Sequence, residues 1–394
     1  MRHIQTYNFK GKKALVRVDF NVPLDANCQV IDGVKISRTI PTIRKVLDDG
    51  GAVILVTHLG RPKQGYEACF SLQHLVSHLA NNLATSVIFA HDCIGPDAQG
   101  KAKQLRPGEV LLLENVRFHP AEEQGDREFA QALAALGDVY INDAFGTAHR
   151  AHASTTVVAQ CFQDKLAGYL LQEEISNVNR VLAGAQKPFT AIIGGAKVLD
   201  KIQALECLLD RADRLLIGGG VANTFQQALG GQLGSSLVEE SQLGTALHLL
   251  EQAKHRHTNI VLPTDVVIAN QLDDQAHTTI VASNAIQDGW MALDIGPQSQ
   301  VAFEQFIQDS KTILWSGPIG VFEIPSFSYG TRYVAAAVAH ATRQGAFSLI
   351  GGGDSAAAIK SLGYSNQVSY ISTGGGALLA YLADQTLPGI RALS

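Results

Sequence analysis

The sequence predicts an α/β protein of two domains, each a parallel sheet flanked by helices, joined by a hinge helix. Three observations lead to this prediction. The chain has 394 residues, and single hydrophobic cores stop growing beyond about 250 to 300 residues. Short β-branched runs alternate with amphipathic stretches in both halves, which is typical of βαβ units. One longer helical pattern, at 170–187, lies between the halves.

Composition and charge exclude several other classes of protein. Apolar residues make up 46% of the chain and charged residues 17%, as in globular rather than disordered proteins. The formal net charge is -5, so there is no overall basic field, and we expect no nucleic-acid partner. Any anion site is therefore expected to be local.

The cysteines and the apolar pattern favour a cytoplasmic location. The five cysteines are scattered and form no CxxC pair, which favours reduced thiols over a disulfide framework. The first residues show no apolar signal-peptide core. No apolar run approaches the ~18 residues of a transmembrane helix, so we expect no membrane partner.

In the first half, short apolar and β-branched runs predict five strands. They are 14–20, 52–58, 86–90, 109–118 and 138–145. The segments 37–49 and 72–84 carry apolar residues at spacings of three and four, which predicts helices between strands. This alternation implies a parallel sheet covered on both faces.

The second half repeats the scheme with six predicted strands, most of which end in glycine. They are 189–196, 214–220, 259–265, 312–318, 347–353 and 367–376. Both halves therefore suit a Rossmann-like sheet. We predict a first domain at 1–170, an interdomain hinge helix at 171–186 and a second domain at 187–380.

The two halves differ in the residues that follow their strands, where open α/β sheets bind ligands. The second half has glycine runs there, which suit nucleotide phosphates because bare amides and a helix N-terminus face the anion. The first half has polar side chains, and its arginines suit a small molecule with phosphate and carboxylate groups. These side chains are Arg17, Asp19, Asn21, His58, Arg61, Arg117, His119, His149, Arg150 and His152. One domain for an anionic acceptor and one for a nucleotide indicate a hinge-closing kinase.

Two common nucleotide-binding motifs are absent from the sequence. There is no GxxxxGK(S/T), which argues against a P-loop NTPase, and no GxGxxG, which argues against a nicotinamide dehydrogenase. The nucleotide prediction therefore depends on GGAKVLDK (194–201), GGG (218–220) and GGGDS (351–355). Alone, each is a weak signal, because a triple glycine after a strand is often a simple turn.

The order of these and other segments resembles the phosphoglycerate kinase family from end to end. The segments are RVDFNVPL (17–24), THLGRP (57–62), LLLENVRFHP (111–120), YINDAFGTAHRAHAST (140–155), IIGGAKVLDKI (192–202), GGGVANTF (218–225), LPTD (262–265), DIGP (294–297), WSGPIGVFE (315–323), GGGDSAAAI (351–359) and STGGGA (372–377). The resemblance implies reversible, Mg²⁺-dependent phosphoryl transfer between ATP and 3-phosphoglycerate, giving ADP and 1,3-bisphosphoglycerate. It also implies a monomer, and a C-terminal segment, 381–394, that returns to the first domain.

By this resemblance, seven side chains hold the acceptor, and the last three arginines form its phosphate clamp. They are Asp19, Asn21, Arg38, His58, Arg61, Arg117 and Arg150. Singly, each arginine would be read as a solvated surface charge, and His58 as a core histidine. His149 and His152 are expected to be structural or supporting.

The resemblance also assigns the nucleotide site. Its residues are Lys197, Lys201, Gly219, Gly220, Pro318, Glu323, Gly351, Gly352, Gly353, Asp354 and Ser355. Lys197 and Lys201 are expected on one face at the start of a helix, where both contact the migrating phosphoryl group. Glu323 would bind the ribose hydroxyls. Asp354 would hold Mg²⁺, or cap the helix that follows it.

Catalysis is assigned to Arg38, Lys197 and Lys201, without a general base. A carboxylate acceptor with a pKa near ~3.5 is already ionised at neutral pH, so positioning and charge neutralisation remain. Ser316 stands where the family usually has asparagine. Two other functions stay open at this point: a different small-acid kinase on the same scaffold, and a non-catalytic scaffold protein.

Overall fold

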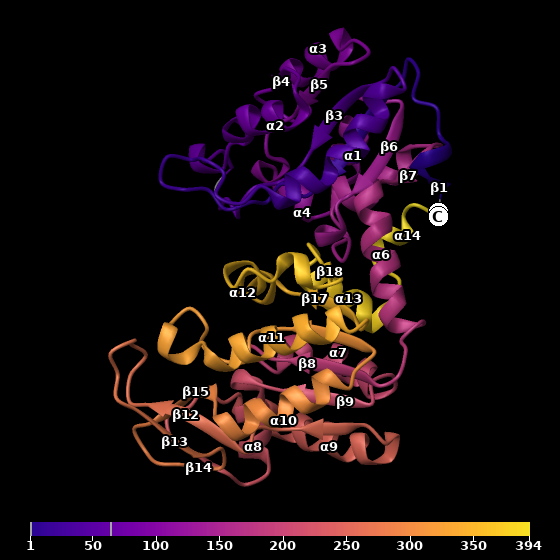
Figure 1. The fold of residues 1–394 in the computed structure, drawn as a ribbon. Coiled ribbons are helices and arrows are strands. Elements are labelled where there is room, and N and C mark those ends of the chain that lie inside the picture. The colour runs from indigo at the N-terminus through magenta and orange to yellow at the C-terminus, as the bar shows by residue number, and fades with distance from the viewer. Residues whose placement is uncertain (1, 64) are drawn as a thin grey trace. The chain divides into compact units, whose positions relative to one another are not determined.

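The computed structural model describes residues 2–63 and 65–394, which divide into two compact units (Figure 1). One unit contains the chain up to Ile175 together with Asp384–Ser394, and the other contains Ser176–Ala383. Parallel sheets flanked by helices in both units confirm the predicted fold class. The hinge, and the functions of the two units, stay predictions.

The first unit is built on a seven-stranded sheet in the order β1-β7-β6-β2-β3-β5-β4. Every neighbouring pair in it is parallel. The strands are β1 (Arg2–His3), β2 (Lys13–Val18), β3 (Ala52–Val56), β4 (Val87–Phe89), β5 (Val110–Leu112), β6 (Val139–Asp143) and β7 (Lys165–Ala167). The sequence pattern missed β1 and β7, whose segments RH and KLA contain no β-branched run.

The helices of the first unit bury apolar residues on one face, except for one short helix whose buried residue is Glu122. In α1 (Val34–Asp48) the buried residues include Ile36, Ile43 and Val46, which recur at helical spacing. The others are α2 (Val76–Leu83), α3 (Pro96–Gln104), α4 (Pro120–Glu123) and α5 (Arg127–Ala134). The start of α5 is set by Asp126, whose side chain accepts a hydrogen bond from the Phe129 amide at 2.8 Å, as an N-cap does.

The second unit contains a six-stranded parallel sheet in the order β11-β9-β8-β16-β17-β18. These six strands correspond to the six predicted runs. They are β8 (Phe189–Ile193), β9 (Arg214–Ile217), β11 (Asn259–Val261), β16 (Thr312–Ser316), β17 (Phe347–Gly351) and β18 (Tyr370–Ile371). The helices are α7 (Ile202–Leu209), α8 (Gly219–Ala228), α9 (Leu243–Arg256), α10 (Pro297–Gln308), α11 (Tyr329–Arg343), α12 (Gly353–Ser361) and α13 (Gly376–Asp384).

A separate three-stranded antiparallel sheet in the second unit was not predicted. It pairs β12 (Asp265–Ala269) with β13 (Thr278–Ala282) on one side and β15 (Met291–Ile295) on the other. A two-stranded parallel pair, β10 (Gln232–Leu233) with β14 (Ala285–Ile286), was missed as well. Most of β13 is exposed, so its residues lack the alternation that marks a half-buried strand.

Helix α6 (Tyr169–Leu182) is shorter than the predicted 170–187. Its first turn is held by two side chains of the first unit: Thr42 Oγ1 accepts from the Tyr169 amide at 2.9 Å, and Asp143 Oδ1 accepts from the Leu171 amide at 3.0 Å. It ends two residues before Gly184, a residue type that disfavours a helix interior. The division between the two units falls inside α6.

The last residues of the chain belong to the first unit. Figure 1 shows the yellow helix α14 (Pro388–Arg391) beside elements coloured magenta. The Gly389 amide donates to the Ala148 carbonyl at 2.8 Å, and a Cβ on Gly389 would lie 3.0 Å from the Thr155 methyl group. Leu387 and Leu393 are buried. No helix in 2–63 or 65–394 is long and apolar enough to cross a membrane.

Leu387→Ala should destabilise the first unit by about 2 to 5 kcal/mol, the usual cost of a cavity left by a buried leucine. Both tryptophans, Trp290 and Trp315, lie in the second unit, so tryptophan fluorescence follows that unit while far-UV circular dichroism follows both. In urea unfolding, the midpoint followed by circular dichroism should be lower for Leu387→Ala than for wild type. The exposed Leu247→Ala is the control, expected within about 0.5 kcal/mol. An unchanged dichroism midpoint in Leu387→Ala would contradict the account.

Candidate functional site

In the first unit, four arginines act on one another at the carboxyl edge of the sheet: Arg17 lies near the end of β2, and Arg61, Arg117 and Arg150 lie in segments that follow β3, β5 and β6. Arg117 is central: its Nη1 donates to the Gly60 carbonyl at 2.7 Å, and its Nε lies 3.3 Å from Glu123 Oε1. Burial, followed by the neighbouring charges of Arg150, Arg17 and Arg61, lowers the pKa of Arg117. So many facing cations make a site for a strongly anionic group.

Asp19 and Asn21 lie at this same carboxyl edge of the sheet, which we call the rim. Burial alone would raise the pKa of Asp19, but the charge of Lys35, whose Nζ lies 2.8 Å from Asp19 Oδ2, and that of Arg17 outweigh it and lower the pKa to about 2. Asn21 Oδ1 accepts from the Gly60 amide at 2.9 Å, which ties the loop after β2 to the loop after β3. Sequence reasoning missed Lys35, although it precedes Arg38 by three residues on α1.

Three histidines of this rim are neutral donors or acceptors rather than cations. Burial is the main cause that lowers the pKa of His58, His149 and His152, and for His152 the value falls to about 4. The Nδ1 atom of His149 is buried without a hydrogen-bond partner among the described residues. Cation charge at this rim therefore comes from arginine and lysine.

Arg38 lies on α1 and pairs with the start of α6. Its Nη2 is 2.9 Å from Glu173 Oε2, and its Nη1 is 4.0 Å from Glu174 Oε1. The Glu174 side chain is fully buried, whereas that of Glu173 is 54% exposed. Lys35, rather than Arg38, is the α1 cation that pairs with Asp19.

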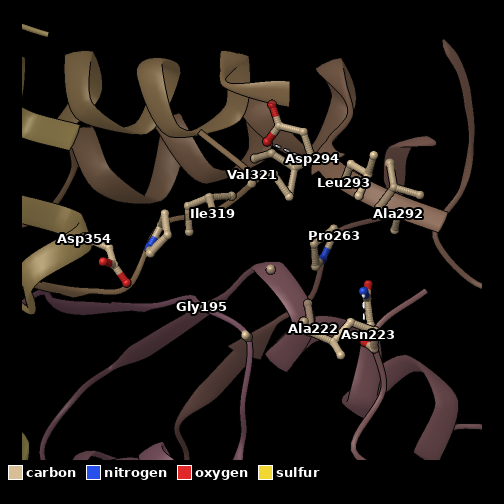
Figure 2. Close-up of a pocket in the computed structure, with 18 of the residues that line it drawn as sticks. Gly195, Ala222, Asn223, Pro263, Ala292, Leu293, Asp294, Ile319, Val321 and Asp354 are labelled. Atoms are coloured by element: carbon tan, nitrogen blue, oxygen red, sulfur yellow. Dashed lines mark hydrogen bonds between the residues drawn. The ribbon is translucent and has the colours of Figure 1, made fainter. Parts of the chain in front are cut away.

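In the second unit, a pocket of about 240 Å³ lies among loops that follow β8, β9 and β16. Figure 2 shows Asp354 and Gly195 toward one side of it and Asn223 and Ala292 toward the other. Five predicted nucleotide residues line it: Gly219, Gly220, Pro318, Glu323 and Asp354. The remaining predicted residues lie outside its lining: Lys197, Lys201, Gly351, Gly352, Gly353 and Ser355.

Glycine at 219 is required by the close approach of two loops. Its φ is +62°, which side chains rarely adopt, and a Cβ there would lie 2.7 Å from the Gly195 carbonyl oxygen. Helix α8 starts at this residue with Gly218 as its N-cap. The Gly219 and Val221 amides donate to the Ile319 and Gly195 carbonyls at 2.9 and 3.2 Å, so it is the Gly220 amide at the start of α8 that suits a phosphate.

The two lysines do not share a helix face, so that prediction is wrong. Lys197 is exposed in an irregular segment, and Lys201 ends a short 3₁₀ turn, Leu199–Lys201, just before α7. Helical spacing requires continuous helix, and the backbone after Gly195 has not yet begun one. Lys201 is largely buried, which lowers its pKa, and its Nζ donates to Ser316 Oγ at 3.4 Å.

The segment Gly351–Ser355 joins β17 to α12. Gly352 is the N-cap of α12, so Asp354 lies in the first turn and is not the cap. Ser355 is buried, and its Oγ accepts from the Gly317 amide at 2.6 Å, which makes it a structural tie between two loops. The exposed Asp354 carboxylate lines the pocket.

The Asp354 carboxylate fits a magnesium ion that is carried by phosphates. No cluster of three or more His, Cys, Asp or Glu side chains that could hold a metal occurs among the described residues. Mg²⁺ in kinase sites typically takes one or two carboxylates and keeps its other ligands as water and phosphate oxygens. A single exposed carboxylate beside open helix amides meets that requirement.

One wall of the pocket comes from residues that sequence reasoning missed. Val266 belongs to β12, and Ala292 and Leu293 belong to β15, the antiparallel sheet whose pattern was not recognised. Burial raises the pKa of the adjoining Asp294 to about 7, while the amides of Gly330 and Ile295, which donate to its carboxyl oxygens at 2.7 and 2.9 Å, act in the opposite direction. The quoted DIGP segment was the available signal for this wall.

Comparisons with known proteins agree with this arrangement. The family model described as phosphoglycerate kinase matches residues 4–385. The chain belongs to the phosphoglycerate kinase family. A phosphoglycerate kinase of Porphyromonas gingivalis is 47% identical over 99% of both chains. Phosphoglycerate kinase 3, cytosolic, of Arabidopsis thaliana is 49% identical over 98% of this chain and 96% of its own.

Solved structures of phosphoglycerate kinases share the fold. The structure from Coxiella burnetii has a TM-score of 0.86 at 39% identity and covers 98% of this chain and 97% of its own. The structure from Pyrococcus horikoshii OT3 has a TM-score of 0.84 at 31% identity and covers 100% and 98%. The predicted family and fold are confirmed, whereas the roles of individual residues stay predictions.

The lowered pKa of His152 predicts a pH-dependent stability. The unfolded chain takes up a proton at His152 near pH 6.5, whereas the folded chain keeps this histidine neutral down to about 4. The unfolded state binds more protons between these values, so stability falls as the pH drops from about 7 toward 4. His152→Gln should lessen that fall in denaturant unfolding, with the exposed His255→Gln as control. Identical pH dependence in wild type and His152→Gln would refute the assignment.

Proposed function

We propose that this chain catalyses reversible phosphoryl transfer between ATP and the carboxylate of 3-phosphoglycerate, giving ADP and 1,3-bisphosphoglycerate. The observation that carries the proposal is the pairing of two sites in a chain that belongs to this kinase family throughout. One unit holds a group of arginines at the carboxyl edge of its sheet, and the other holds a pocket lined by glycine loops. An enzyme that joins an anionic acid to a nucleotide phosphate needs both.

The acceptor acid is assigned to the rim of the first unit. The phosphate of 3-phosphoglycerate would contact Arg61, Arg117 and Arg150, because the guanidinium fork binds phosphate in a bidentate manner. Asp19, Asn21 and His58 would hold the carbon chain and its hydroxyl group by hydrogen bonds. The pKa of Asp19 is lowered to about 2, so its carboxylate is ionised at neutral pH. This supports its role in accepting a hydrogen bond from the hydroxyl group.

The nucleotide is assigned to the second unit. Gly220 would offer its backbone amide to the phosphates, and Gly219, whose own amide donates to Ile319, would let them approach the backbone closely. Gly351, Gly352 and Gly353, from the end of β17 to the start of α12, would offer further amides. Glu323, exposed at the pocket edge, would accept hydrogen bonds from the ribose. Pro318 and the apolar wall would contact the base and sugar of the nucleotide. Ser355, which accepts from the Gly317 amide, would support the loop that carries Pro318.

The transfer step needs positioning and charge neutralisation rather than a base. The attacking carboxylate is already ionised near neutral pH, since its ordinary pKa is ~3.5. Lys201, Lys197 and Arg38 would neutralise charge that spreads over the migrating phosphoryl group. Bound Mg²⁺, held by Asp354, would supply further neutralisation of the nucleotide phosphates.

Domain closure is part of the proposal. Reacting atoms must approach to about 3 to 3.5 Å, and water must be excluded from an acyl phosphate, yet the two assigned sites belong to different units. We assign the acceptor to 1–170, the nucleotide to 187–380 and the hinge to the segment around α6. We also propose a cytoplasmic monomer. The five free cysteines and the name of the cytosolic Arabidopsis relative support the location.

A coupled assay tests the function directly. The purified chain should phosphorylate 3-phosphoglycerate with ATP and Mg²⁺, and should leave acetate, aspartate and glycerate unreacted because they lack the phosphate that the arginine group binds. If the protein phosphorylates another of these acids faster than 3-phosphoglycerate, that acid is the acceptor and the proposal is wrong on this point. Absence of turnover with every acid in a folded protein would favour a non-catalytic scaffold.

Arg38→Ala should lower kcat by roughly 10³ to 10⁵, by analogy with an arginine finger, with a smaller effect on nucleotide affinity. In the proposal Arg38 exchanges its Glu173 partner for the phosphoryl group. Lysine should restore only part of kcat, because it lacks the planar fork. Arg127→Ala, at an exposed position of α5, is the matched control and should change stability by about 0.5 kcal/mol or less. Near-normal kcat in folded Arg38→Ala would eliminate the transition-state role.

Asp354→Asn should raise the Mg²⁺ concentration needed for half-maximal activity, because an amide is a weaker ligand for a hard cation than a carboxylate. KM for 3-phosphoglycerate should change little, since the acceptor is assigned to the other unit. Initial rates at varied Mg²⁺ and fixed ATP measure the shift. Asp288→Asn, an exposed aspartate of the same unit, is the control. A Mg²⁺ dependence like that of wild type would remove Asp354 as the ligand.

A further inference from the structure

Four side chains form a buried hydrogen-bonded row behind the acceptor rim: Glu122, Ser154, Arg17 and His58. We propose that Arg17 is a positioning residue that holds His58 as the neutral tautomer with its proton on Nε2, and that Ser154 and Glu122 hold Arg17 in place. The inference deepens the proposed function, on which it relies only for the identity of the acid that His58 meets.

The row crosses four elements and is closed to solvent. Arg17 lies in β2, His58 follows β3, Glu122 lies in α4, and Ser154 lies in the π-helical turn Ala153–Val157. The exposed fractions of these residues are between 1% and 3%. Water therefore cannot satisfy their polar atoms, and their bonds to one another must do so.

The direction of each hydrogen bond is set by the chemistry of the groups. Ser154 Oγ is 2.6 Å from Glu122 Oε1, and the Ser154 amide donates to Glu122 Oε2 at 2.8 Å. The guanidinium of Arg17 has donors and no acceptor, so its Nε donates to Ser154 Oγ, which lies 2.8 Å away, and the single hydroxyl proton of Ser154 is left for Glu122.

The same rule decides the protonation of His58. A guanidinium has donors and no acceptor. Arg17 Nη1 donates to the Val18 carbonyl, and Nη2 lies 3.3 Å from His58 Nδ1. His58 Nδ1 must therefore accept, and a neutral imidazole that accepts at Nδ1 carries its proton at Nε2.

Burial is the main cause that opposes the protonation of His58. Arg17 from β2, Arg117 from the turn after β5 and Lys35 from α1 face it with positive charge, and Asp19 from the loop after β2 faces it with negative charge. Burial acts in the same direction as the three cations and against Asp19, and the pKa of His58 is lowered well below 6.5. His58 thus remains a neutral N–H donor over the range in which free histidine titrates.

A fixed donor is useful beside an anionic acid. With the proton on Nε2, His58 can donate to an oxygen of the acceptor, whereas the other tautomer would turn a nitrogen lone pair toward that oxygen. Arg17 carries a permanent charge, so it holds the productive tautomer at any physiological pH without itself contacting the acid.

The ring nitrogens of His58 test the proposal in the full-length wild-type protein. Nitrogen NMR of histidine-labelled protein, with the His58 signals assigned from their loss in His58→Gln, should show a protonated Nε2 and an unprotonated Nδ1. This pattern should persist from about pH 8 down to about pH 5, below the ordinary histidine pKa. A proton on Nδ1, or a charged ring near pH 6.5, would overturn the proposal.

Variants separate positioning from simple stabilisation. Ser154→Ala breaks the link between Arg17 and Glu122 and should produce a mixture of His58 tautomers. It should also raise KM for 3-phosphoglycerate about tenfold, the equivalent of one hydrogen bond, with KM for ATP unchanged. Ser71→Ala is matched, because Ser71 Oγ also donates to a buried glutamate, Glu114, at 2.7 Å in the same unit, yet it should leave the His58 signals as in wild type.

The outcomes remain distinguishable. Arg17→Met removes the donor to His58 Nδ1 and should also give a mixture of His58 tautomers. If this variant fails to fold, the wild-type tautomer and Ser154→Ala still decide the question. If His58 shows the predicted tautomer but the protein does not turn over 3-phosphoglycerate, the proposed function is rejected and the positioning role of Arg17 is kept. Normal turnover with His58 protonated on Nδ1, or equal effects of Ser154→Ala and Ser71→Ala on the His58 signals, would reject the positioning role alone.

Discussion

Parallel pairing of strands is the constraint on which both sites depend. Parallel strands bring their carboxyl ends to one edge of a sheet, so residues far apart in sequence meet there. In the first unit Arg17 is in register with Val56 and Asn142, which brings together the loops that carry Asp19 and His58. In the second unit Ser316 is in register with Ile193 and Gly351, so three glycine-bearing loops begin at one edge.

The two units use this edge in opposite ways to attract phosphate. The first unit gathers guanidinium groups and leaves few acids among them, so that burial and mutual repulsion lower the pKa of Arg117. That arrangement is unfavourable until an anion neutralises it. The second unit removes side chains instead: a Cβ at Gly219 would overlap the Gly195 carbonyl, and the bare N-terminus of α8 supplies the positive potential. Side-chain charge suits a small acid, and backbone amides suit a chain of phosphates.

Neutral histidines complete the first site. His58, His149 and His152 all lie among cations, and the pKa of each is lowered. The site thus contains neutral imidazole nitrogens beside permanently charged guanidinium groups. This division would suit an acceptor whose carboxylate needs no deprotonation.

The sequence by itself determined the family, the fold class and the strand runs that became β2, β3, β4, β5 and β6 and the sheet of the second unit, because hydrophobic period and motif order are local properties. It could not identify β13, whose exposed residues carry no period, nor the apolar pocket wall that β12 and β15 provide. It also misjudged Lys197 and Lys201, since residue spacing describes a helix face only where the backbone is helical. The pairing of Lys35 with Asp19 and the row from Glu122 to His58 were decided by tertiary structure alone. Those contacts join side chains from separate elements, and only the folded chain brings their donors and acceptors within reach of one another.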